Sequence, residues 1–94
     1  MTDDAVRLAI HPSVVFRELE GEAVLLNLDS GVYYGLDAVG TRVWTLVAEH
    51  GTERGVCDQM EREYDVSPDV LARDVGRLLG ELRAKGLLVA VAPA

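Results

Sequence analysis

The chain has 94 residues, of which 49% are hydrophobic, and its formal net charge is −7 at pH 7. This length and composition predict a single folded domain over residues 1–94. The acidic excess excludes nucleic acid and anionic membrane surfaces as main partners, because both attract clustered cations. One Cys and two His supply neither an internal disulfide nor a metal cluster, so we expect no metal and no cofactor.

Localisation signals are equally sparse. No apolar run approaches the roughly 18 residues that cross a bilayer. The residues after Met1 are acidic rather than basic, unlike a secretory signal. We therefore expect a cytoplasmic protein that does not bind membranes, with residues 1–5 forming a flexible tail.

Strand-forming residues dominate the first half of the chain. Residues 14–19 are β-branched and aromatic, and residues 22–28 are rich in Val and Leu. Residues 32–36 form a third strand-like run. Between the last two runs, residues 29–31 suit a three-residue hairpin loop, because Gly31 can adopt the positive φ of a bulge.

A three-residue loop sets the register between the second and third strands. It predicts three facing pairs on the core side: Leu28 with Val32, Leu26 with Tyr34, and Val24 with Leu36. Leu25, Tyr33 and Gly35 then lie on the opposite face. A two-residue loop would reverse this division on one strand, so the prediction of the faces depends on the loop length.

Helix signals dominate the second half. Asp37 suits the N-cap of a helix over residues 38–50, and Gly51 suits its C-terminal end. The apolar positions of this helix follow helical spacing: Val39, Val43, Leu46 and Val47, with Trp44 beside them. Thr52 opens a second helix, whose apolar residues recur at four-residue steps: Val56, Met60 and Tyr64.

The third helix has the strongest start signal. Residues 67–69 supply a serine N-cap, a proline at the first helical position and an acid near the positive end of the helix dipole. Its predicted apolar stripe comprises Leu71, Val75, Leu78 and Leu82. Gly86 ends this helix, and residues 6–10 and 87–91 are predicted as further short strands.

Strands followed by helices predict an α+β fold. We expect a winged-helix-like arrangement in which a three-stranded antiparallel sheet precedes three helices. If residues 22–28 form the central strand, residues 32–36 form an edge strand beside the helices. An exposed edge can pair with an extended peptide, so the fold favours a peptide-binding protein.

Few side chains could carry catalysis. Cys57 is predicted on a helix without a cationic neighbour that would lower its pKa. His11 lies in a loop and His50 at a helix C-terminus, and neither has an adjacent Ser or Cys. The sequence therefore predicts that the chain is not an enzyme.

A longer pattern resembles a known family. Residues 25–37, LLNLDSGVYYGLD in one-letter code, are followed by Gly40 and by the pair Val43–Trp44. Together with matching positions up to residue 89, this pattern resembles the PqqD-like family, and most of all the stand-alone members of lasso-peptide gene clusters. Asp37 stands where many relatives carry Asn, and both residues can cap a helix.

The resemblance implies a function. Members of this family bind the leader segment of a ribosomally made precursor peptide and present it to modifying enzymes. In lasso-peptide clusters, those enzymes are a leader peptidase and a cyclase. The resemblance also implies that the leader adds as a strand to residues 32–36 and lies between them and the third helix.

The peptide-binding residues follow from this placement. On the strand and the helix they are Val32, Tyr33, Tyr34, Gly35, Leu36, Val70, Asp74, Arg77, Leu78 and Glu81. The opposite flank of the helix, with Ala72, Gly76 and Leu79, is left to pack against a neighbouring helix. The tyrosine that points away from the core is expected to be the binding hot spot, and the sequence leaves open which one that is.

Charge gives a further expectation about the ligand. Residues 67–86 carry four cations and three anions, whereas residues 1–37 carry two cations and seven anions. The third helix is therefore less acidic than the strands, which favours a partly acidic leader.

Other interpretations stay open at this stage. The precursor could belong to a quinone-cofactor pathway or to a radical-modified peptide. A winged-helix DNA-binding regulator would need a basic recognition helix, which the acids on the third helix argue against. A purely structural subunit of a processing enzyme is the third alternative. The oligomeric state is also open.

Overall fold

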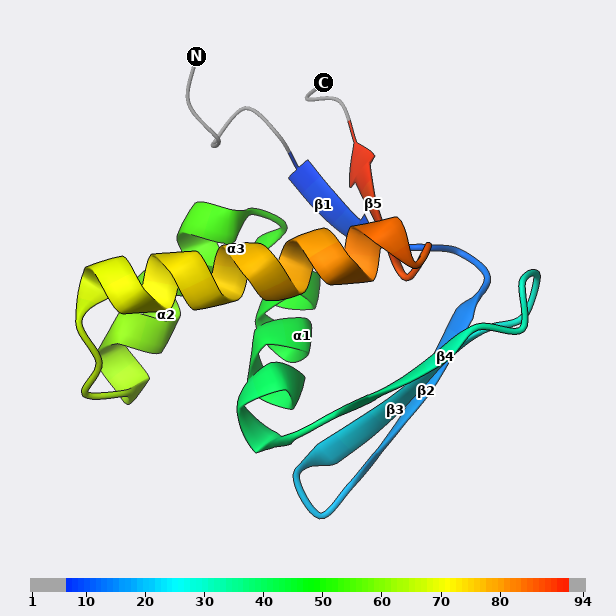
Figure 1. Cartoon of the computed structure of the whole chain (residues 1–94), viewed down its shortest axis with the longest axis horizontal. Helices are drawn as coiled ribbons and strands as arrows, with labels where there is room; N and C mark the ends of the chain where they lie inside the picture. The colour runs from blue at the N-terminus through cyan, green and yellow to red at the C-terminus, as the bar shows by residue number, and fades with distance from the viewer. Residues whose placement is uncertain (1–6, 92–94) are drawn as a thin grey trace.

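The computed structural model describes residues 7–91. In chain order its elements are β1 (Arg7–Ile10), β2 (Val14–Leu19), β3 (Glu22–Asn27), β4 (Tyr33–Leu36), α1 (Ala38–His50), α2 (Glu53–Glu63), α3 (Pro68–Ala84) and β5 (Leu88–Val91). An antiparallel sheet in the order β2-β3-β4 precedes the three helices, which confirms the predicted α+β fold (Figure 1). The predicted tail and Val6 lie outside the described residues.

The helix boundaries agree closely with those predicted from the sequence, because side-chain caps define where the helices begin. Asp37 accepts a hydrogen bond from the Gly40 N–H at the start of α1, and Gly51 ends this helix in the left-handed conformation. Thr52 and Ser67 cap α2 and α3 in the same way. Each cap satisfies a backbone donor that the first helical turn leaves unpaired.

The turn between β3 and β4 is one residue longer than predicted. It spans residues 28–31 and closes where the Asn27 N–H donates to the Val32 carbonyl at 2.9 Å. The Asn27 side-chain oxygen accepts hydrogen bonds from the backbone N–H groups of Asp29 and Ser30 at 2.9 and 3.2 Å. This buried side chain therefore holds the turn at four residues.

The longer turn reverses the predicted faces of β3. The register pairs Leu25 with Tyr34 and Ala23 with Leu36. Leu25 is consequently in the core at 0% exposure, whereas it was predicted on the opposite face. The predicted core positions were wrong: Val24 and Leu26 lie on the outer face of β3, and Leu28 is exposed in the turn. The inward positions of Tyr34 and Leu36 on β4 are confirmed.

The first and last strands pair with each other in a second, two-stranded sheet. β1 and β5 are antiparallel, with Leu8 opposite Ala90 and Ile10 opposite Leu88. The Leu8 N–H donates to the Gly51 carbonyl at 2.7 Å, which ties this sheet to the end of α1. Sequence analysis predicted both strands but not their pairing.

The core lies between the inner face of the larger sheet and the helices. Trp44 on α1 is fully buried, and the Phe16 ring meets it edge to face at 5.5 Å between centroids. On α3 the buried stripe is Leu71, Val75, Leu79 and Leu82. Leu79 therefore takes the place predicted for Leu78, which is only half-buried.

No helix within residues 7–91 combines the length and the apolar character needed to cross a membrane.

Candidate peptide-binding groove

The edge strand β4 presents an unused row of backbone groups. Within residues 7–91, β4 pairs only with β3, on one side. Along an antiparallel strand, the backbone groups of every second residue point toward the neighbouring strand. The Asn27 N–H donates to the Val32 carbonyl, so Val32 is one of the residues whose carbonyl points toward β3. The N–H and C=O groups of Tyr34 and Leu36 are turned toward β3, and those of Tyr33 and Gly35 are turned outward. The outward groups could pair with an extended peptide.

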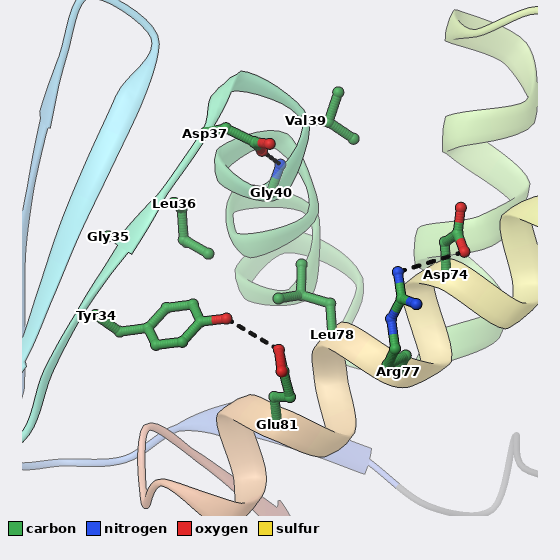
Figure 2. A pocket seen from close by; sticks show the side chains of 10 residues that line it. All are labelled: Tyr34, Gly35, Leu36, Asp37, Val39, Gly40, Asp74, Arg77, Leu78 and Glu81. Carbon is green, nitrogen blue, oxygen red and sulfur yellow. Dashed lines mark hydrogen bonds and ion pairs between the residues drawn. The ribbon is translucent and has the colours of Figure 1, made fainter.

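A groove of about 350 Å³ lies between this edge, the first turn of α1 and one side of α3 (Figure 2). Its lining residues are Tyr34, Gly35, Leu36, Asp37, Val39, Gly40, Asp74, Arg77, Leu78 and Glu81. Its apolar surface comes from Leu36, Val39 and Leu78. The groove therefore offers apolar surface next to an unpaired strand edge.

Tyr34 and Glu81 join the two walls of the groove. The Tyr34 hydroxyl donates a hydrogen bond to Glu81 Oε2 at 2.9 Å, as Figure 2 shows. This hydrogen bond, together with desolvation and the negative charge of Glu81, raises the pKa of Tyr34 above its ordinary value. The Lys85 ammonium lies 5.8 Å from the centre of the Tyr34 ring, where it makes a cation–π contact. Two residues therefore hold the tyrosine: Glu81 on α3 and Lys85 at the C-cap of the same helix.

The charged side chains of the lining are mostly acidic. Asp37, Asp74 and Glu81 stand against one guanidinium, that of Arg77. Arg77 lies 3.6 Å from Asp74 on the same helix, in an exposed ion pair. Asp37 is occupied in capping α1 but keeps its negative charge.

The structure brings together most of the binding residues predicted from the sequence. Those that line the groove are Tyr34, Gly35, Leu36, Asp74, Arg77, Leu78 and Glu81. Two predicted residues are not part of the lining: Val32, which precedes β4, and Val70, which lies in the first turn of α3. On the other flank, Glu53 of α2 lies beside Gly76 and Leu79 is buried in the core, whereas Ala72 is exposed and does not pack against a neighbouring helix.

The two tyrosines lie on opposite faces of β4. Tyr33 is 73% exposed and points to the outer face of the sheet, whereas Tyr34 points toward α3. The tyrosine that points away from the core is therefore Tyr33, and the one that lines the groove is Tyr34, because the groove lies on the core side of β4.

Sequence analysis missed three lining residues, all from the start of α1: Asp37, Val39 and Gly40. It placed Val39 among the apolar core positions of the helix, but Val39 is 49% exposed. A signal was present, because Asp37 caps α1 directly after β4. This one-residue connection forces the first turn of α1 to lie beside the end of the strand.

Groups that could carry chemistry lie apart from the groove. Cys57 on α2 is half-buried, and desolvation raises the pKa of its thiol, with nearby acids adding to the effect. His11 Nδ1 accepts a hydrogen bond from the Ser13 N–H at 3.0 Å, a local structural role. Within residues 7–91, no group of three His, Cys, Asp or Glu residues is arranged to hold a metal ion.

Two solved structures have a similar fold. The structure of TbiB1 in complex with the TbiA(beta) leader peptide has a TM-score of 0.80 and 39% sequence identity, and the match covers 84% of this chain and 92% of that one. Lasso peptide synthetase B1 complexed with the leader peptide has a TM-score of 0.79 and 20% identity, covering 88% of this chain and 98% of the other. No curated protein matches the sequence.

The family comparison covers the whole groove. The model described as coenzyme PQQ synthesis protein D (PqqD) matches residues 22–88, which include β3, β4 and all three helices. Both walls of the groove therefore belong to the matched region. The chain belongs to the PqqD family.

Proposed function

We propose that this protein binds the leader segment of a ribosomally made precursor peptide and presents it to processing enzymes in lasso-peptide biosynthesis. The leader adds as a strand to the outer edge of β4 and lays alternate side chains into the groove against α3. The processing partners are a leader peptidase and a cyclase, and the step takes place in the cytoplasm, where the precursor is made.

The observation that carries this proposal is the combination of an unpaired strand edge with an apolar groove beside it. Backbone hydrogen bonds to the edge would give affinity without requiring a particular sequence, and the groove would select side chains. The TbiB1 structure, at 39% identity, was determined with a leader peptide, which supports the same class of ligand here.

In this proposal the chain contributes binding, and the chemistry belongs to its partners. The groove lining contains no Ser, Cys, Lys or His that could act as a nucleophile or a neutral base. Cys57 lies on α2, outside the lining, and its raised pKa keeps the thiol protonated at neutral pH. We expect Cys57→Ala to leave leader binding intact.

Isothermal titration calorimetry tests the proposal. The titrant is a synthetic leader of the lasso-peptide precursor on which the protein is proposed to act, and a scrambled peptide of the same composition is the control. We expect a Kd of about 1 μM or tighter, equivalent to about −8 kcal/mol, with no metal or nucleotide present. Absence of binding at tens of micromolar would contradict the proposal.

A further inference from the structure

The charges that face the groove differ from the overall charge of α3. Along the whole helix three cations balance three anions, but Arg73 and Arg83 are not part of the groove lining. The α3 side chains that do line it are Asp74, Arg77 and Glu81, together with the uncharged Leu78. With Asp37 from the opposite wall, the lining is net negative.

Of the three carboxylates that line the groove, Glu81 is the one that neither caps a helix nor forms an ion pair with a cation within residues 7–91. Asp74 is offset by Arg77 at 3.6 Å, and Asp37 is used as the N-cap of α1. Glu81 instead accepts the Tyr34 hydroxyl at 2.9 Å. A carboxylate offers about four lone-pair positions, so one bond from a tyrosine leaves most of its acceptor capacity for a ligand.

An apolar surface lies next to this carboxylate. Leu78 is one turn before Glu81 on α3, and Leu36 faces it from β4 (Figure 2). A strand added to β4 would direct every second side chain into the groove, at a spacing of about 6.8 Å. Neighbouring inward side chains of one ligand could therefore reach the leucines and Glu81 together.

We propose that the groove selects a peptide segment that combines an apolar side chain, seated on Leu36 and Leu78, with a Lys or Arg side chain bound by Glu81. Tyr34 is a positioning residue in this arrangement, because its hydroxyl orients the Glu81 carboxylate toward the groove. The inference rests on the proposed function and specifies the ligand of the same site.

This inference replaces the sequence-based expectation of a partly acidic leader. That expectation used the net charge of residues 67–86, which includes cations outside the groove. Lys85 does not alter the conclusion, because its ammonium lies over the Tyr34 ring and is not part of the lining. An acidic ligand would meet Asp37 and Glu81 at close range, and like charges repel.

A displayed library of random 15-residue peptides tests the selection without assuming any ligand sequence. The full chain is the bait, in parallel with Glu81→Gln and with Glu61→Gln, which removes the same charge from an exposed position on α2. We expect peptides enriched by the wild type and by Glu61→Gln to place Lys or Arg near an apolar residue. Glu81→Gln should lose this preference.

One enriched peptide is then synthesised and measured by fluorescence anisotropy. Glu81→Gln should weaken its binding about five- to tenfold, and Glu61→Gln by less than about twofold. Replacing the basic residue of the peptide with norleucine should abolish the difference between wild type and Glu81→Gln, as expected for a direct pair in a double-mutant cycle. Tyr34→Phe should give a smaller loss confined to the basic peptide.

The outcomes separate the two proposals. If no peptide is enriched, or if enriched peptides bind Gly35→Pro as well as wild type, the β4 edge is not a peptide site and the proposed function fails. If peptides require the β4 edge but show no basic enrichment and no sensitivity to Glu81→Gln, only the charge selection is overturned. Circular dichroism melts of each variant exclude unfolding as the cause.

Discussion

The sheet has two outer edges, and they differ in what stands beside them. β4 carries the uncharged sequence Tyr-Tyr-Gly-Leu, and α3 lies across a groove from it. β2 carries Arg17 and Glu18, and most of its residues are exposed. Charged side chains on a strand edge discourage pairing with other chains. An unpaired edge thus becomes a selective site only where a second wall holds the side chains of the ligand.

On the inner side of β2 the layer beside the edge is filled differently. Phe16 covers the buried Trp44 edge to face, so the position next to this edge is occupied by a residue of the sheet itself. On the inner side of β4, Tyr34 and side chains from α3 lie next to each other, and the groove is the space left between them. The two edges can therefore be tested against each other with matched substitutions.

The largest effect is expected from proline at an outward-facing backbone position of each edge. Gly35 turns its N–H away from β3, does not have a positive φ, and has open space where a Cβ would stand. Gly35→Pro should leave the ladder intact but remove a donor and obstruct an incoming strand. We expect leader affinity in calorimetry to fall about thirtyfold or more, equivalent to about 2 kcal/mol.

Glu18→Pro is the matched control on β2. The Leu28 N–H donates to the Ser13 carbonyl, and the alternation of the ladder from there turns the Glu18 N–H outward, as at Gly35. This variant should bind the leader within about twofold of wild type. A reversed result, with Glu18→Pro defective and Gly35→Pro normal, would assign the ligand to β2.

The helix boundaries and the faces of β3 differ in how well the sequence predicts them. The helix boundaries were accurate because capping is local: Asp37, Thr52 and Ser67 each bond a backbone group three residues ahead. The prediction of which β3 residues face the core was wrong, because residues 23–28 are almost uniformly apolar and contain no alternation that would fix a face.

The residue that decides the register acts over a long distance. Besides holding the turn, Asn27 donates from Nδ2 to the Gly86 carbonyl at 2.9 Å, which links β3 to the end of α3. A buried Asn with several partners cannot be distinguished from a loop residue by periodicity alone. The placement of the groove between β4 and α3 was implied by the family resemblance, but its acidic character depends on which α3 side chains face β4.

Truncation of the two tyrosines should give the next largest effect, and it separates the faces of β4. Tyr34→Ala removes a groove wall and should weaken leader binding about ten- to hundredfold, or about 1–3 kcal/mol. It should also lower the melting temperature, because Tyr34 packs against the core. Tyr33→Ala, at a position 73% exposed, should change both quantities little.

The relative size of the two losses is the decisive result. If Tyr33→Ala weakens binding more than Tyr34→Ala, the ligand lies on the outer face of the sheet and the groove is not its site. Comparing each affinity with the melting temperature of the same variant distinguishes lost contacts from lost stability. Tyr34→Phe, which keeps the ring, should restore most of the stability.

The smallest effect is expected from the ionisation of Tyr34, which tests the bridge across the groove. The hydrogen bond to Glu81, then desolvation and the charges of Glu81 and Asp37, raise the pKa of Tyr34 above its ordinary value of 10.0. A folded-state pKa above the unfolded value means that the bridge stabilises the protein fully below pH 10 and loses this contribution as pH rises through the raised pKa.

The absorbance of tyrosinate near 295 nm, taken as the difference between wild type and Tyr34→Phe, should therefore titrate above 10. The melting-temperature difference between these two proteins should shrink over the same range, and Glu81→Gln should bring the titration of Tyr34 down toward its ordinary pKa. If Glu81→Gln leaves the titration unchanged, the hydroxyl does not bond Glu81 in solution, and Tyr34 meets the ligand only through its ring.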